Sequence, residues 1–275
     1  MQRDQEAGPD RRQSLGSADT PLVLIHTNDT HGRLQPPVTD RLRQVVEEHP
    51  GALLLDAGDA ISAGNLGFRV GGEPVLETMS GLGYHAMCLG NRESHPRREI
   101  FPLKIDRARF PILSANAVAK GDAPLPVQPH VVLARGGVRI GVFGVTVPMF
   151  TRKQWSQPLC DYWFDDPLKA AKEQVAALRP RVDLLVALTH IGYRQDEALA
   201  AACPELDLII GGHSHTDLDA PAWIAGVPVL QARAFGFYAG IARLAREPEP
   251  GAERGWRLVS WEKRPLRPDA PGPRE

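Results

Sequence analysis

The chain has 275 residues, of which 43% are hydrophobic and 24% charged, and its 32 Lys and Arg nearly balance 33 Asp and Glu. This composition is typical of a globular protein with a substantial core, and the net charge of -1 argues against a dedicated nucleic-acid binder. The three cysteines (Cys88, Cys160 and Cys203) form no CxxC pair, which argues against a disulfide framework or thiolate zinc knuckle and favours a reducing compartment.

The first residues contain no apolar run that could form the core of a signal peptide, and no stretch approaches about eighteen apolar residues. We therefore predict a cytoplasmic protein with no membrane contact. A single domain is expected over residues 21–266, between a flexible N-terminal segment (1–20) and a flexible, Pro-rich tail (267–275).

Short apolar runs that end in polar clusters predict buried strands. In chain order, these runs are 21–29, 51–59, 85–91, 182–190 and 206–215. Segments with helical spacing lie at 38–49, 73–83, 166–179 and 195–203. Strands that alternate with helices indicate an α/β fold.

Two further regions predict antiparallel strands. The stretch 130–148 contains two apolar runs around an Arg-Gly-Gly turn, which is typical of a hairpin. The region from 227 to about 262 contains extended runs with interleaved Arg. We therefore expect a mixed sheet system.

Side chains that can bind metal ions lie at the ends of the five predicted strands. They are Asp29 and His31, Asp59, Asn91, His190, and His213 with His215. Because strand ends in α/β sheets converge on one edge, we expect these side chains to meet there. The pairs Asp29/His31 and His213/His215 are two residues apart, and in extended backbone this spacing places both side chains on one side.

Seven nitrogen and oxygen ligands are too few for two separate closed sites. They suffice for two ions about 3.5 to 4 Å apart when one carboxylate bridges them, and Asp59 is the predicted bridge. Ligands of this kind, without thiolate, suit Mn, Fe, Zn or Co better than copper or calcium, and ligand type alone leaves the choice open.

Other polar residues are expected to have structural roles. Four histidines show no such convergence and are predicted to be structural or exposed, namely His26, His49, His85 and His130. Asp56 is predicted to fix the loop before Asp59, and Cys88 to behave as a small buried hydrophobe.

Five ordered blocks of the sequence resemble the motifs of the calcineurin-like metallophosphoesterases. They read HTNDTHGRL, DAGDAISAGN, GYHAMCLGNRE, LTHIGY and IIGGHSHT. The blocks FPILSANA and GGVRIGVFGVTVP are similar to the 5′-nucleotidase and 2′,3′-cyclic phosphodiesterase branch, so the resemblance covers residues 21 to about 245.

The resemblance implies a four-layer α/β-β/α metallophosphatase sandwich with two mixed sheets and two divalent ions, Mn²⁺ being favoured and Fe, Zn or Co the alternatives. One ion would be held by Asp29, His31, Asp59 and His215. The other would be held by Asp59, Asn91, His190 and His213. A hydroxide between the ions would attack phosphorus, so the resemblance implies a phosphoesterase acting on small phosphorylated substrates, nucleotide-like or sugar phosphates, with a place in nucleotide catabolism.

The third block departs from the family pattern, which reads Gly-Asn-His-Glu followed by Phe-Asp and supplies a His–Asp dyad beside the leaving group. Here Arg92 replaces the histidine and His95 replaces the aspartate. Because arginine stays protonated, it can bind a phosphate oxygen but cannot give a proton to a leaving alkoxide. Asn91, Arg92 and His95 are the predicted catalytic residues.

In this hypothesis Arg92 clamps the phosphate, and His95 or a metal-bound water supplies the proton. The alternative is that Arg92 only pairs with Glu93, Glu99 or another carboxylate.

Two other functions stay open. The chain could be a non-catalytic metal- and phosphate-binding regulatory domain, although retention of every ligand favours the enzyme. It could also act on single-stranded nucleic acid, with Trp256 and Trp261 stacking bases, although the near-neutral charge favours tryptophans that cover an outer sheet face. Relatives that act on nucleotides carry a further domain after the metal domain, which this sequence does not reach, so nucleotide specificity is not inherited. The oligomeric state is not predicted.

Overall fold

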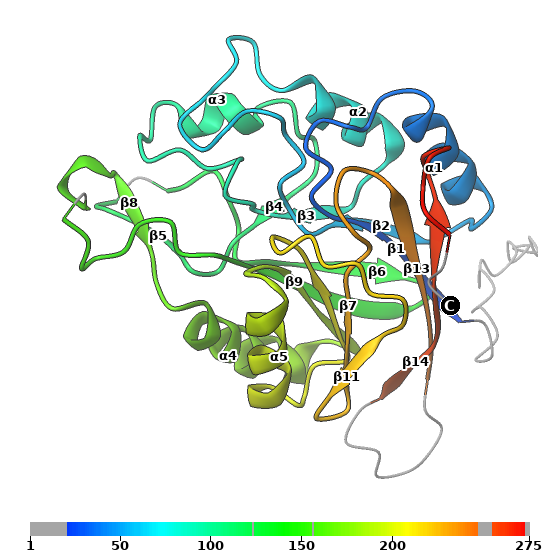
Figure 1. Ribbon diagram of the computed structural model, residues 1–275. Coiled ribbons are helices and arrows are strands. Elements are labelled where there is room, and N and C mark those ends of the chain that lie inside the picture. Colours follow the sequence, from blue (N-terminus) through cyan, green and yellow to red (C-terminus); the bar gives the residue numbers. More distant parts are fainter. Residues whose placement is uncertain (1–20, 123, 156, 247–254, 273–275) are drawn as a thin grey trace, which may run out of the picture.

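The computed structural model describes residues 21–122, 124–155, 157–246 and 255–272. Two six-stranded sheets lie face to face, and helices cover the outer face of each sheet (Figure 1). Residues 1–20 and 273–275 of the two segments predicted to be flexible lie outside the described residues, so the domain limits stay a prediction.

The first sheet has the strand order β14-β13-β1-β2-β3-β4. Its strands are β1 (Leu22–Thr27), β2 (Leu53–Asp56), β3 (Ala86–Cys88), β4 (Ile112–Leu113), β13 (Tyr238–Arg246) and β14 (Trp256–Pro265). Strands β1 to β4 are parallel, whereas β13 pairs antiparallel with both β1 and β14. Every residue of β2, β3 and β4 is buried, as expected for parallel strands that are covered on both faces.

The second sheet has the strand order β11-β12-β10-β9-β7-β6. Its strands are β6 (His130–Arg135), β7 (Val138–Thr146), β9 (Leu184–His190), β10 (Leu208–Gly211), β11 (Ala222–Ile224) and β12 (Val227–Leu230). The predicted hairpin is confirmed, because β6 and β7 are antiparallel and the turn between them is made by Gly136 (φ 54°) and Gly137 (φ 78°).

Three apolar layers hold the elements together. Between the sheets, side chains such as Leu55, Val142 and Ile210 are fully buried. The first sheet packs against α1 (Val38–Glu47), α2 (Pro74–Leu82) and α3 (Phe101–Ile105). The second sheet packs against α4 (Pro167–Leu178) and α5 (Tyr193–Ala202). The predicted four-layer sandwich with two mixed sheets is therefore confirmed.

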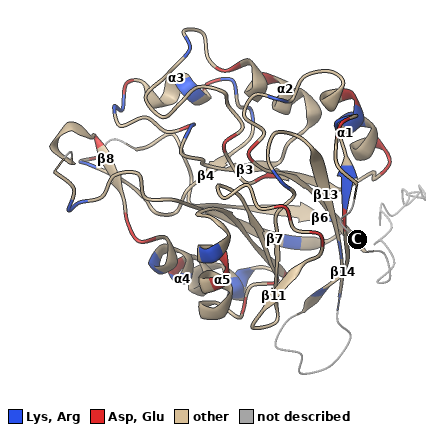
Figure 2. Ribbon diagram, viewed as in Figure 1, with Lys and Arg blue, Asp and Glu red and all other residues tan. Residues whose placement is uncertain are grey.

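Short elements complete the chain. A small sheet pairs β5 (Ala117–Ala119) with β8 (Tyr162–Phe164), and 3-10 turns span Gln157–Leu159 and Arg179–Arg181. Charged residues of both signs lie on the outer helices (Figure 2). Within the described part of the chain, no helix combines the length and apolarity needed to cross a membrane.

The residues expected to be structural have structural partners. His26 accepts a hydrogen bond from the Trp261 indole nitrogen at 3.0 Å, and His85 Nδ1 accepts one from the Leu54 amide at 3.1 Å. Trp256 is buried between the sheets, so the expectation that it covers an outer sheet face was wrong, because its strand β14 turns this side chain toward the core. All three cysteines are buried, and none forms a disulfide within the described residues.

Candidate metal centre

The seven predicted ligands lie at one edge of the sandwich, at or just beyond the carboxyl ends of five parallel strands. Those on the first sheet follow β1, β2 and β3, and those on the second end β9 or follow β10. A contact between the sheets joins the two sets, because the His213 amide donates to both carboxylate oxygens of Asp29 at 3.1 and 3.0 Å. The expected convergence of strand ends is therefore present.

A first group consists of Asp29, His31 and His215, each with a potential ligand atom within 4.8 Å of the others. The two Nε2 atoms of the histidines are 3.0 Å apart, and His215 Nε2 is 3.5 Å from Asp29 Oδ1. His31 Nδ1 is buried and has no hydrogen-bond partner among the described residues. The Phe235 ring packs against both imidazoles, with centroid separations of 5.1 Å.

A second group consists of Asp29, Asp59 and His190, again with potential ligand atoms within 4.8 Å of one another. The Asn91 side-chain oxygen joins it, at 3.1 Å from His190 Nε2 and 3.0 Å from His213 Nδ1. His190 Nδ1 lies 2.8 Å from the Ala57 carbonyl oxygen, to which it donates its proton.

In the neutral form of the ring this hydrogen bond leaves an unshared electron pair on His190 Nε2, which faces two oxygens. Asp59 Oδ1 is 3.4 Å away and Asn91 Oδ1 is 3.1 Å away. Three acceptors that face one another repel unless a cation or a proton lies between them, and a carbonyl partner on the second ring nitrogen is typical of metal-binding histidines. The donor set therefore fits a divalent cation.

Asp29 is common to both groups, whereas Asp59 belongs to the second. The bridging role predicted for Asp59 stays a prediction. Burial on its own would raise the pKa of both carboxyl groups, but neighbouring histidines outweigh this effect, lowering the pKa of Asp29 and bringing that of Asp59 to about 2. Both carboxylates are ionised at neutral pH.

The histidines differ in their protonation. Burial lowers the pKa of His31 to about 4 and also lowers that of His213. Burial acts in the same direction on His190, but the adjacent carboxylates Asp59 and Asp29 prevail and raise its pKa to about 10. The position beside His190 therefore strongly favours a positive charge, which a proton or a metal ion can supply.

The backbone at these residues differs from the extended conformation that we predicted. Five of the seven residues have a left-handed backbone, with φ values of 49° (Asp29), 47° (His31), 56° (Asp59), 74° (His213) and 54° (His215). The sequence prediction was wrong here because β1 ends at Thr27 and β10 at Gly211, so the i, i+2 pairs lie in turns. Such a conformation costs about 1–3 kcal/mol per non-glycine residue and concentrates at functional sites.

Comparison with known proteins identifies the family. The sequence model of the calcineurin-like phosphoesterases matches residues 22–217. The chain belongs to this family. Rat 5′-nucleotidase is 34% identical over 273 residues, which cover 81% of this chain and 46% of the rat protein. Vibrio cholerae 5′-nucleotidase is 33% identical over 220 residues, with coverages of 70% and 40%. The phosphoesterase chain thus spans about half the length of these curated relatives.

Solved structures agree with this assignment. The 5′-nucleotidase precursor from Thermus thermophilus superposes with a TM-score of 0.68 at 27% identity, covering 88% of this chain and 54% of its own. The calcineurin-like phosphoesterase YfkN from Bacillus subtilis has the same fold, with a TM-score of 0.71 at 21% identity and coverages of 92% and 93%. The phosphoesterase therefore has the metallophosphatase fold and is similar to the 5′-nucleotidase branch.

Glu93 is a residue of the phosphoesterase site whose role the sequence analysis missed. Its buried carboxylate accepts hydrogen bonds from the backbone N–H groups of Asp59 (3.0 Å), Ile61 (3.1 Å) and Gly90 (2.9 Å). A Cβ atom at Gly90 would lie 2.2 Å from the Asp59 nitrogen, so the two loops touch there. The sequence signal was its match to the last residue of the Gly-Asn-His-Glu pattern, two residues after Asn91.

Two other residues that the sequence analysis missed form hydrogen bonds that fix the loops around the site. The Asn28 side chain donates to Asp29 Oδ2 at 2.8 Å and accepts from the Ala232 amide at 2.9 Å. The buried Lys104 ammonium donates to the Gly64 carbonyl at 2.9 Å and to the Ser94 carbonyl at 3.1 Å, and burial lowers its pKa to about 8. These bonds connect the loops that carry the predicted ligands.

Arg92 lies beside the second group. Its amide donates to Asp59 Oδ1 at 2.8 Å, its Nη1 donates to the Ser62 carbonyl at 3.1 Å, and its Nε is 3.6 Å from Asp59 Oδ2. The carboxylate beside Arg92 is therefore that of Asp59, rather than Glu93 or Glu99. The Arg92 side chain is 35% exposed, which leaves part of the guanidinium open to a ligand.

His95 has a different environment. It is 6% exposed, and its Nδ1 accepts a hydrogen bond from the Arg97 amide at 3.0 Å. Among the described contacts, none joins His95 to the seven predicted ligands. The structure thus brings Asn91 and Arg92 into the site and shows His95 engaged within its own loop.

Proposed function

We propose that the protein hydrolyses small phosphate esters, nucleotide-like or sugar phosphates, with two divalent ions held by the seven residues of the two groups. The observation that carries this proposal is the convergence of Asp59, Asn91 and His190 acceptors around one point, with a carbonyl bond fixing the histidine. The similarity to proteins named 5′-nucleotidases supports phosphate esters as substrates and a place in nucleotide catabolism.

The assignment of residues to ions follows the family resemblance, with Asp29, His31, Asp59 and His215 holding one ion. Asp59, Asn91, His190 and His213 hold the other. Bound there, such ions supply a hydroxide at neutral pH and offset the charge on the phosphate oxygens. Nitrogen and oxygen donors without thiolate suit Mn, Fe, Zn or Co, and the family resemblance favours Mn²⁺ among them.

Arg92 binds a phosphate oxygen in this proposal. Its partly exposed guanidinium is held beside Asp59 and the Ser62 carbonyl, and its forked donors match a tetrahedral anion. Because the guanidinium stays charged, it stabilises the developing negative charge and gives no proton. His95 is a weak candidate donor, since its Nδ1 is occupied by the Arg97 amide, and water is the better one.

The lack of a positioned acid predicts a strong dependence on the leaving group. Aryl phosphates are expected to react faster than alkyl monoesters, because a general acid typically contributes about 10² to 10⁴-fold. The Arg92→His variant, which restores the histidine of the family pattern, should narrow this difference. Equal rates for esters whose leaving groups differ widely in pKa would contradict the role given to Arg92.

The decisive experiment uses metal-stripped protein, a mono-aryl and a bis-aryl chromogenic phosphate, and Mn²⁺, Zn²⁺, Mg²⁺ or Ca²⁺ added singly. Turnover restored by a transition metal supports the phosphoesterase, and the ratio of diester to monoester narrows the substrate class. Two bound ions per chain without turnover would instead favour the alternative, a metal- and phosphate-binding regulatory domain. A cytoplasmic location belongs to the same proposal and is supported by three cysteines that form no disulfide within the described residues.

A further inference from the structure

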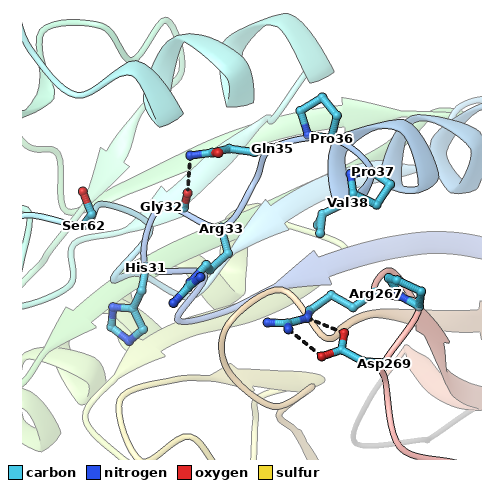
Figure 3. A pocket seen from close by; sticks show the side chains of 11 residues that line it. His31, Gly32, Arg33, Gln35, Pro36, Pro37, Val38, Ser62, Arg267 and Asp269 are labelled. Carbon is cyan, nitrogen blue, oxygen red and sulfur yellow. Dashed lines mark hydrogen bonds and ion pairs between the residues drawn. The ribbon is translucent and has the colours of Figure 1, made fainter.

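A cavity of about 560 Å³ opens beside the first group of predicted ligands. Its lining includes His31, Arg33, Ser62, Arg267 and Asp269 (Figure 3). This volume lies within the range of about 300–1,000 Å³ that small-molecule sites occupy. The cavity can therefore hold a group of the size of a small leaving group.

The cavity is continuous with the catalytic groups through two of its lining residues. His31 belongs to the first group, and the Ser62 carbonyl accepts the hydrogen bond from Arg92. A substrate whose phosphate lies against Arg92 would extend its remaining part past Ser62 and His31. The part of such a substrate beyond the scissile bond would then lie in this cavity.

Two arginines give the cavity its charge. The exposed Arg33 guanidinium forms no ion pair or hydrogen bond within the described residues. Arg267 instead donates through Nε and Nη2 to both carboxylate oxygens of Asp269, at 2.8 and 2.6 Å. Since Asp269 offsets Arg267, the positive charge of Arg33 is left uncompensated among these side chains.

The wall next to Arg33 is closely packed. A Cβ atom added at Gly236 would lie 3.3 Å from a Val38 methyl carbon and 3.7 Å from the Arg33 Cβ. Phe235, in the same turn, contacts the His31 ring. The Cβ of Arg33 therefore lies close to this turn, and the rest of its exposed side chain can reach a ligand in the cavity.

We propose that this cavity selects substrates whose leaving group carries a second anionic oxygen group, a carboxylate or a phosphate, which Arg33 binds. The inference rests on the proposed function and specifies its substrate class. A fixed cation in a cleft favours anionic ligands, and a charge-assisted hydrogen bond is about twice as strong as a neutral one.

The test compares 4-carboxyphenyl phosphate with 4-carbamoylphenyl phosphate, two esters of similar shape that differ in the charge of the leaving group. For metal-loaded wild type we expect a higher kcat/KM for the carboxylate. Arg33→Gln should reduce this preference about tenfold, as loss of one charge-assisted bond implies. An unchanged preference in Arg33→Gln, or no preference in the wild type, would overturn the inference.

Two further variants act as controls of opposite kind. Asp269→Asn frees Arg267 and should increase the preference about two- to threefold, because a partly exposed pair is a weak competitor. Arg41→Gln removes an exposed arginine of α1 that does not line the cavity, and the preference should stay at the wild-type value.

The ester 1,4-phenylene bisphosphate distinguishes a phosphate from a carboxylate as the preferred second anion.

Failure of the inference and failure of the proposed function give different results. If wild type hydrolyses both esters equally well, the cavity does not select charge and only the inference fails. If neither ester is hydrolysed with any ion, the proposed function fails, and calorimetric dissociation constants of the intact esters still test Arg33. In that case, equal affinities of wild type and Arg33→Gln for the carboxylate would overturn the inference as well.

Discussion

His26, near the end of β1 in the first sheet, and His190, at the end of β9 in the second, are both fully buried, yet their surroundings make them opposite in character. Burial is the largest influence on both and lowers the pKa of each. At His26 no charged neighbour opposes the effect of burial, and the pKa falls to about 3. At His190 two carboxylates outweigh the effect of burial, and the pKa rises to about 10.

The contacts explain this difference. The His26 ring lies against Gly240, where a Cβ atom would come within 2.0 Å of His26 Nε2, and its polar neighbour is the Trp261 indole. His190 faces Asp59 and Asn91. A buried histidine is thus a packing element or a candidate ligand depending on the charges around it, and burial alone does not distinguish the two.

The largest effect is expected from the removal of the charge beside His190. Asp59→Asn should lower kcat/KM by at least about a thousandfold, because metal-ion stabilisation is worth several kcal/mol. Metal content, measured by mass spectrometry, should fall as well. Asp40→Asn, at an exposed position on α1, is the matched control. Full metal content in Asp59→Asn would show that the bridging assignment is wrong.

The two histidines themselves provide the next test. His190→Gln should reduce activity about a hundredfold or more, since it removes a ligand of the second group. His26→Leu should keep activity but lower the free energy of unfolding by about 1–3 kcal/mol, because the Trp261 N–H is left without an acceptor. Urea denaturation and initial rates measure both quantities. An inactive but fully stable His26→Leu protein would contradict the division of roles.

Glu93 tests how much the surroundings of the second group matter. Glu93→Gln should weaken metal affinity about 10 to 100-fold, as is usual for residues that support ligands, because three backbone N–H groups lose their shared carboxylate. Competition with a metal-sensitive dye measures the affinity. Glu99→Gln, at an exposed site, should bind metal like the wild type, and equal affinities for all three proteins would remove Glu93 from this role.

The smallest effect concerns the pH dependence of stability. The pKa of His26 is lowered from 6.5 to about 3 on folding, so the unfolded chain binds more protons between these values. The stability of the fold with a neutral, buried His26 is therefore fully present above pH 6.5. As the pH falls, the free energy of unfolding decreases, by about 2 kcal/mol at pH 5. In metal-free protein, wild type should lose that much more stability than His26→Leu between pH 7 and pH 5. Parallel denaturation curves would contradict the burial effect.

The sequence predicted those elements whose pattern is long and regular. The apolar runs 182–190 and 206–215 became β9 and β10, and the Gly136–Gly137 pair determined the β6–β7 hairpin, because positive φ at both residues is what such a turn requires. The small β5–β8 sheet was not predicted, because three-residue strands contain too few positions to show alternation.

The site was predictable in composition but not in geometry. All seven proposed ligands were found from strand ends and motif resemblance, because convergence at a sheet edge follows from parallel topology. The left-handed backbone at Asp29 and His31 was not foreseen, since it depends on bonds such as Asp29 N–H to the Gly58 carbonyl. The role of Glu93 was missed although it matches the Gly-Asn-His-Glu pattern, because a motif does not show that its partners are backbone N–H groups.

The left-handed residues of the site have a consequence for protein engineering. At His31 or His215, glycine relieves the backbone at no steric cost, so a redesign guided by folding stability alone would choose it. Such a redesign would give a more heat-resistant protein that lacks these proposed metal ligands. A thermostabilised phosphoesterase therefore has to be sought with these positions held constant and the substitutions confined to the outer helices.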